Sequence, residues 1–117
     1  MNTKEFNLML VENFPNLIEK YNEEVSWQEG DETGSHVVYG DVLTPYLEQC
    51  LKENNNSEVK KILEFLEKIL SYKIKYSDEV VAVSVLEGTV YEYKDSKILN
   101  DNYGPLTIKL IKEMREA

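Results

Sequence analysis

The sequence has little cysteine and histidine and no long apolar run. Its single cysteine, Cys50, excludes a disulfide within the chain and favours a reducing compartment. Its single histidine, His36, excludes a metal site built on a pair of histidines. The longest apolar runs, Val80 to Val83 among them, are far shorter than the roughly 20 residues that cross a bilayer. The first residues have neither the basic start nor the apolar core of a signal peptide, so we expect a cytoplasmic protein.

Recognisable catalytic and cofactor motifs are also missing. The sequence contains no glycine-rich phosphate loop, no nucleophile elbow and no C-x-x-C pair, so we expect no cofactor, no metal and no catalytic residue. Among the basic residues, Arg115 is the only arginine, the side chain best suited to clamping phosphate. A net charge of −9 further argues against binding to nucleic acid or to an anionic membrane.

The net negative charge of the chain arises entirely in its first half. Residues 1–58 carry three lysines and twelve acidic residues, whereas residues 59–117 carry ten basic and ten acidic residues. The densest acidic stretch runs from Glu19 to Glu32, with Trp27 in its middle. An acidic surface that holds an aromatic side chain suits a basic protein partner, because charge steers the encounter and the aromatic ring adds contact area. The candidate partner-binding residues are Glu23, Glu24, Trp27, Glu29, Asp31 and Glu32. Trp27 either folds back as a plug or serves as the anchor for a partner, and the sequence leaves both open.

The chain is long enough for a single domain, residues 1–117, with one core. Apolar residues recur at helical spacing, and capping residues or prolines mark the helix starts. We expect helices from Thr3, as the cap, to about Asn13; from Pro15 to about Glu24; from Ser57, as the cap, to about Tyr72; and from Pro105 onward. Between residues 36 and 52, either a helix begins at Thr44 with Pro45 in its first turn, or one helix from about His36 kinks at Pro45.

The valine-rich run from Val80 to Leu86 suits either a buried strand or a central helix. We predict a helix that starts near Ser77, because no second strand of similar quality is available to pair with it. Its apolar character nearly all round predicts that neighbours cover it on several sides. The expected fold is therefore all-α, a compact bundle or short array of six to seven antiparallel helices.

The segment from Gly34 to Leu47, GSHVVYGDVLTPYL, resembles the signature of a family of small, uncharacterised bacterial cytoplasmic proteins, similar to H-[IV]-V-[FY]-G-D-V-L-x-P-Y-L. The segments Val83–Glu87 and Tyr103–Pro105 resemble further parts of these proteins, except that Tyr103 stands where methionine is expected. The resemblance covers roughly residues 14–116 and implies stacked antiparallel helix pairs, with no established activity. Some small acidic proteins of this kind resemble immunity proteins, which neutralise a toxin by binding it.

Three functions follow from these patterns. The first is an immunity-type inhibitor whose acidic surface docks on a basic toxin, such as a nuclease. The second is a small enzyme with a pocket formed by His36, Asp41 and Glu48, although His36 and Asp41 also suit local hydrogen bonds at a helix start. The third is a homodimeric regulatory or structural subunit that pairs through tyrosines at its rim.

Overall fold

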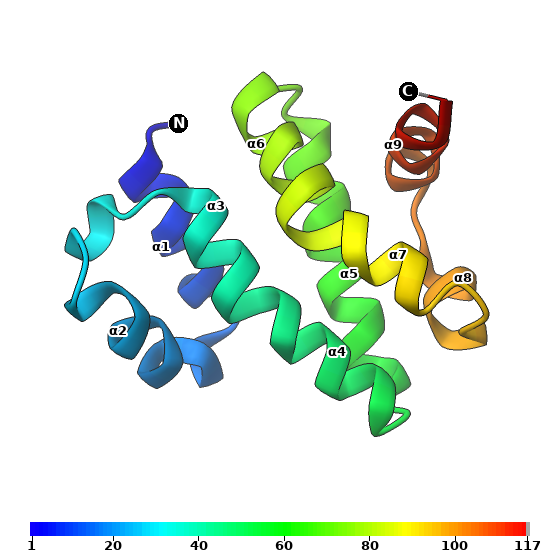
Figure 1. Cartoon of the computed structure of the whole chain (residues 1–117), viewed down its shortest axis with the longest axis horizontal. Helices are drawn as coiled ribbons and strands as arrows, with labels where there is room; N and C mark the ends of the chain where they lie inside the picture. Colours follow the sequence, from blue (N-terminus) through cyan, green and yellow to red (C-terminus); the bar gives the residue numbers. More distant parts are fainter. Residues whose placement is uncertain (117) are drawn as a thin grey trace.

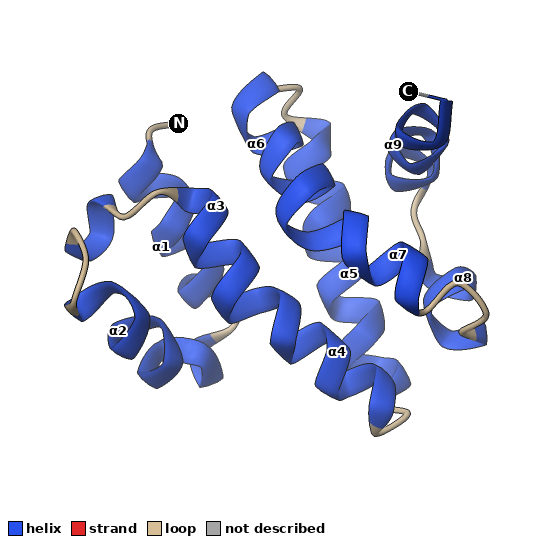
Figure 2. Ribbon diagram, viewed as in Figure 1, coloured by secondary structure: helices blue, strands red, loops and turns tan. Residues whose placement is uncertain are grey.

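The computed structural model describes residues 1–116, and every regular element in that range is helical (Figure 2). The elements are α1 (Thr3–Asn13), η1 (Pro15–Leu17), α2 (Ile18–Ser26), η2 (Gly30–Glu32), α3 (Ser35–Val38), η3 (Tyr39–Leu43), α4 (Thr44–Lys52), α5 (Asn56–Ser71), α6 (Lys75–Glu79), η4 (Val80–Leu86), α7 (Glu87–Glu92), α8 (Lys97–Asn102) and α9 (Pro105–Glu116). Because η1 continues into α2, α3 through η3 into α4, and α6 through η4 into α7, the described part forms seven continuous helices and one short turn. This architecture confirms the predicted all-α fold.

The two long composite helices lie side by side at the middle of the molecule, where η3 packs against η4 (Figure 1). Helix α5 packs against α4, α6, α8 and α9, so it joins the two halves of the bundle. Helices α1 and α2 lie at one end and α7, α8 and α9 at the other (Figure 1). None of the helices within residues 1–116 is long and apolar enough to cross a membrane.

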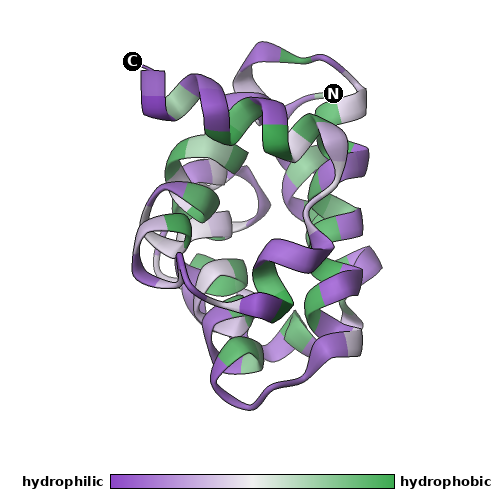
Figure 3. Cartoon of the chain, turned by 90° about the vertical axis from the view of Figure 1, so that its right-hand side faces the viewer, coloured by the Kyte–Doolittle hydropathy of each residue, from purple (hydrophilic) through white to green (hydrophobic). Residues whose placement is uncertain are grey.

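An aromatic cluster ties α1, η3 and α5 together in the core. The rings of Phe6 and Tyr39 stack with their centroids 4.3 Å apart, and the Tyr39 hydroxyl donates a hydrogen bond to the Phe6 carbonyl oxygen at 2.7 Å. Phe65 of α5 meets Phe14 edge to face, with 5.3 Å between ring centroids. All four side chains are buried, and each apolar group removed from water stabilises the folded state. Along most helices hydrophobic and hydrophilic residues alternate (Figure 3), as expected for helices that bury one face.

The helix around Pro45 is continuous, as in the second of the two alternatives, and a π-helical segment stands where that alternative placed a kink. It begins at Ser35 and runs without a break to Lys52, with the π-helical segment η3 immediately before Pro45. In η3 the Thr44 N–H donates to the Tyr39 carbonyl, five residues back. Pro45 has no N–H to donate, and its ring would crowd the carbonyl four residues earlier in a regular α-helix. The wider π turn therefore accommodates the proline within one continuous helix.

The run Val80–Leu86 is helical, as predicted, and forms the π-helical segment η4. Its helix begins at Lys75, so the prediction of a start near Ser77 is wrong by two residues. The prediction that neighbours cover the run on several sides holds only in part. Val80, Val81, Val85 and Leu86 are buried, whereas Val83 is 57% exposed.

Two predicted helix caps are also wrong. Asn2, not Thr3, caps α1: its side chain accepts from the Glu5 N–H, and the Glu5 carboxylate accepts from the Asn2 N–H. Asn55, not Ser57, caps α5, since its side chain accepts from the Glu58 N–H. In both cases an acidic residue stands three positions after the true cap, which is the pattern of a capping box.

A carboxylate from α5 caps the last helix. Glu67 accepts hydrogen bonds from the Leu106 N–H at 2.6 Å, the Thr107 N–H at 3.0 Å and the Thr107 hydroxyl at 2.8 Å. A Cβ atom at Gly104 would overlap the Glu67 carboxyl group, so the close approach requires glycine here. Gly104 follows α8 and Pro105 opens α9, as the sequence predicts.

Candidate functional site

The acidic segment after α2 is held in place by a buried asparagine of α1. The Asn7 amide donates to the carbonyl oxygens of Asp31, at 3.0 Å, and Thr33, at 2.6 Å. Its own oxygen accepts from the Ser35 hydroxyl at 2.8 Å. Asn7, Thr33 and Ser35 are almost fully buried, so these bonds replace the ones that water would otherwise make. The segment is therefore an ordered structure anchored to the helical core.

Trp27 lies at the outer side of this anchored segment and points to solvent. It is the C-cap residue of α2, and its side chain is 74% exposed. This exposure excludes the plug, and the role of an anchor for a partner stays a prediction. A shallow hollow of about 210 Å³ beside it is lined by Trp27, Lys20, Glu23 and Glu24. The contact of the exposed indole with water is unfavourable. A partner that buries this side chain would therefore gain binding free energy.

The acidic residues predicted around Trp27 differ in how free their carboxylates are. Glu23, Glu29 and Glu32 are exposed. Glu24 is half-buried and accepts a hydrogen bond from the Gln28 amide at 2.9 Å. Asp31 is half-buried and accepts from the Tyr21 hydroxyl at 2.7 Å. Burial, and then the hydrogen bond to Asp31, raises the pKa of Tyr21, so this phenol stays a donor at neutral pH.

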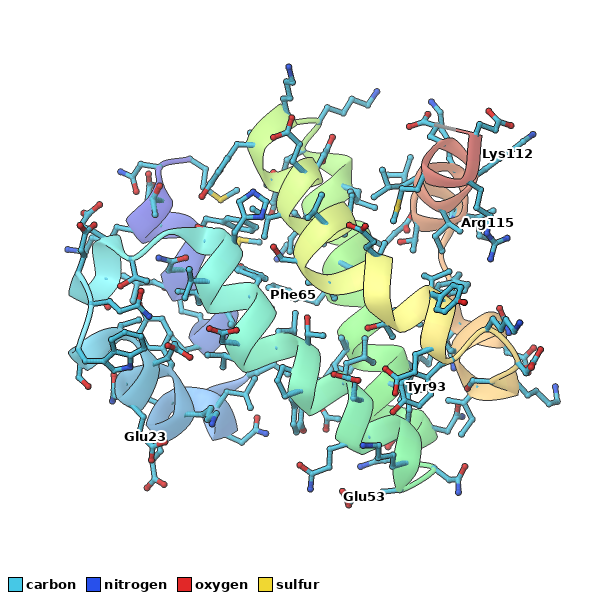
Figure 4. All side chains as sticks on the ribbon, viewed as in Figure 1. Glu23, Glu53, Phe65, Tyr93, Lys112 and Arg115 are labelled. Carbon is cyan, nitrogen blue, oxygen red and sulfur yellow. The ribbon has the colours of Figure 1, made fainter. Side chains whose placement is uncertain are left out.

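Because Asp31 is occupied by Tyr21, its carboxylate helps to fix the segment rather than extend the exposed surface. Of the predicted carboxylates, Glu23, Glu29 and Glu32 are therefore the accessible ones, and Glu23 and Glu24 lie beside Trp27. We call these four carboxylates and the indole the Trp27 surface. Figure 4 shows Glu23 projecting outward from the end of the molecule that α1 and α2 form.

The three residues of the second candidate pocket have separate surroundings. His36 is exposed, and its Nδ1 lies 2.7 Å from the Ser84 hydroxyl, so it links α3 to η4. Asp41 is exposed on η3, and Glu48 is half-buried on α4. No hydrogen bond within residues 1–116 joins any two of them. No group of three or more histidine, cysteine, aspartate or glutamate residues in that range is placed to hold a metal ion.

A second hollow, of about 500 Å³, lies at the opposite end of the molecule, between η4–α7 and α9. Its apolar lining includes Val83, Tyr91 and Met114, and Tyr91 is 81% exposed. This hollow differs from the prediction that neighbours cover the valine-rich run on several sides. The signal for it in the sequence is that the run has apolar residues on every side. A side that no neighbouring helix covers then leaves an apolar surface in contact with solvent.

Comparison with known proteins places the chain in a family but attaches no activity to it. A family model described as "Domain of unknown function (DUF7674)" matches residues 7–116. No curated protein matches the chain, and no solved structure does. The match covers nearly the whole of the described fold, including the Trp27 surface and the hollow beside α9. The function must therefore be argued from these surfaces themselves.

Proposed function

The chain belongs to the DUF7674 family, a domain of unknown function, and we propose that it is an acidic protein-binding module that docks on a basic protein. The observation that carries the proposal is the exposure of Trp27, at 74%, on an ordered acidic surface. Tryptophan is the residue type most enriched among those that dominate binding energies. Carboxylates around it raise the rate at which a cationic surface arrives and repel anionic competitors.

The partner class we propose is a toxin with a cationic face, such as a nuclease, which this chain inhibits as an immunity protein. The carboxylates of the Trp27 surface mimic the phosphates that such a face binds, and the indole fills an apolar site next to it. Inhibition then follows from occupation of the substrate face. The resemblance to small acidic immunity-like proteins supports the same class of partner.

The test begins with capture of the partner by the tagged protein at about 50 mM and about 500 mM salt, since screening at high salt weakens surface charge pairs. Association and dissociation rates of the identified partner are then measured for wild type and for the triple variant Glu23→Lys, Glu24→Lys, Glu29→Lys. We expect association to slow by roughly tenfold or more, with dissociation little changed. Asp31 is left intact because Tyr21 depends on it.

A matched control distinguishes the effect of where the charges lie from the effect of the total charge. The triple variant Glu53→Lys, Glu64→Lys, Glu79→Lys changes the total charge by the same amount at exposed sites elsewhere in the chain. It should slow association much less than the first variant. Trp27→Ala should instead speed dissociation by roughly 30-fold or more, as loss of a central aromatic does. Equal association rates for both triple variants would refute the role of the Trp27 surface, and a partner that keeps its activity when bound would refute inhibition.

A further inference from the structure

The hollow beside α9 is built to receive an apolar group. Its floor includes the buried side chains of Val90 and Ile111, and its walls include Val83, Tyr91 and Met114. Its volume of about 500 Å³ lies within the range of binding pockets, roughly 300–1,000 Å³. Val83 is 57% and Tyr91 81% exposed, so apolar area remains in contact with water at its edge. Such a concave apolar site on a soluble surface marks a place of interaction.

The charges at the hollow favour the binding of an acidic group. Lys94 and Arg115 both line it, and neither forms an ion pair with another residue of the described part of the chain. Arg115 also lines a neighbouring hollow of about 310 Å³ together with Lys112. Figure 4 labels both side chains on α9. Glu87 is the acidic residue of the lining and opposes these cations. An aromatic group flanked by carboxylates matches this combination of apolar walls and cations.

The same chain carries such a group, and we infer that the hollow beside α9 binds the Trp27 surface of a second copy. In this contact the indole enters the hollow next to Arg115, and an arginine over a tryptophan face is a favourable cation–π pair. Glu23 and Glu24 then face Lys94 and Arg115. The inference uses the surface of the proposed function but requires no basic partner protein.

The geometry makes this contact intermolecular and head to tail. Helix α2 and helices α7 and α9 lie at opposite ends of the molecule, so one chain cannot bring its own Trp27 into its own hollow (Figure 1). A contact between two different patches leaves a free patch at each end and allows further copies to add. The net charge of −9 opposes association. At about 0.15 M salt this repulsion is screened beyond about 8 Å, whereas charges in direct contact still attract.

Sedimentation velocity of the purified chain from about 10 µM to about 1 mM, at about 150 mM salt, tests the inference. We expect the mean mass of wild type to rise steadily with concentration and to pass that of a dimer. Trp27→Ala and Arg115→Glu should each weaken this association by roughly tenfold or more. Glu87→Lys removes the opposing charge and should shift association to lower concentration. Tyr72→Ala and Lys109→Glu, exposed residues outside both surfaces, serve as matched controls and should behave as wild type.

Mixing the two weakened variants gives the decisive result. The Trp27→Ala chain keeps an intact hollow, and the Arg115→Glu chain keeps an intact Trp27 surface, so the mixture should form a 1:1 complex that grows no further. Lys94→Glu replaces Arg115→Glu in a repeat of the experiment. A wild type that stays monomeric at about 1 mM, or a mixture that stays monomeric, would overturn the inference. Arg115→Glu should still capture a basic partner as wild type does, so failure here and failure of the proposed function are distinguishable.

Discussion

The attachment of α9 to the bundle gives the sharpest prediction on stability. Glu67→Gln keeps the shape of the side chain but removes its charge and one of its two acceptor atoms. The three donors that now bind the carboxylate are the Leu106 N–H, the Thr107 N–H and the Thr107 hydroxyl. In the variant, at least one backbone N–H at the start of α9 faces the new amide NH₂ group and loses its acceptor.

The magnitude follows from these bonds. An unsatisfied N–H costs about 1–3 kcal/mol, and conversion of a charge-assisted bond to a neutral one costs about 1 kcal/mol more. We therefore expect the free energy of unfolding to fall by about 2–4 kcal/mol, which is about 8–16 °C in Tm for a chain of this size. Denaturant unfolding followed by circular dichroism measures the change directly.

Glu64→Gln is the matched control, because Glu64 lies one turn earlier on α5 and is exposed. Its unfolding free energy should stay within about 0.5 kcal/mol of wild type. If Glu67→Gln is equally harmless, the cap contributes nothing and the reasoning fails. Gly104→Ala tests the same contact from the other side: its Cβ displaces the Glu67 carboxylate, so it should destabilise wild type but cost at least about 1 kcal/mol less in a Glu67→Ala background.

Three further predictions concern buried polar groups. Asn7→Ala should lower the unfolding free energy by about 2–3 kcal/mol and make the segment around Trp27 the first site of proteolysis, because the carbonyls it satisfies lose their donor. Burial raises the pKa of Tyr39, and raises that of Tyr103 to about 12, so both phenols should resist ionisation in an ultraviolet titration until the protein unfolds. An unfolded tyrosine ionises near pH 10, whereas these two phenols stay protonated in the folded protein. Tyr39 and Tyr103 therefore leave the free energy of unfolding unchanged below pH 10 and reduce it as the pH rises above 10. Burial likewise raises the pKa of the Cys50 thiol, so a thiol reagent should label the native protein slowly and the unfolded protein at once.

The helical content could be predicted from the sequence because the helical spacing of apolar residues agrees with the capping residues and prolines at helix starts along most of the chain. The cap errors had a local cause: Asn2 and Asn55 each compete with a nearby Thr3 or Ser57. In α1 the acidic residue three positions after the asparagine, Glu5, adds a second, reciprocal bond that favours Asn2. Pro45 was ambiguous because a π turn before it cannot be distinguished from a helix start by periodicity alone.

The surfaces were harder to predict for a different reason. The segment that follows Trp27 is held by Asn7, which lies 24 residues before the Asp31 carbonyl that it binds. Tyr21 withdraws Asp31 from the acidic surface through a similar tertiary bond. Neither contact leaves a local pattern in the sequence. The hollow beside α9 also arises only when Val83 and Met114, far apart in the chain, are placed on neighbouring helices.

Helix α9 has one more consequence, which concerns how the molecule opens. Of its twelve residues, only Thr107 and Ile111 are buried, and its start depends on the Glu67 cap. Detaching it therefore costs less free energy than unfolding the whole bundle, and its amide hydrogens should exchange with solvent before those of α5. Ile111 and Met114 belong to α9 and line the hollow, so the hollow exists only while α9 is packed on the bundle. A ligand of the hollow therefore binds only the state in which α9 is attached. Binding of a ligand in the hollow should therefore slow the hydrogen exchange of the α9 amides, residues 105–116, even where the ligand does not contact their backbone.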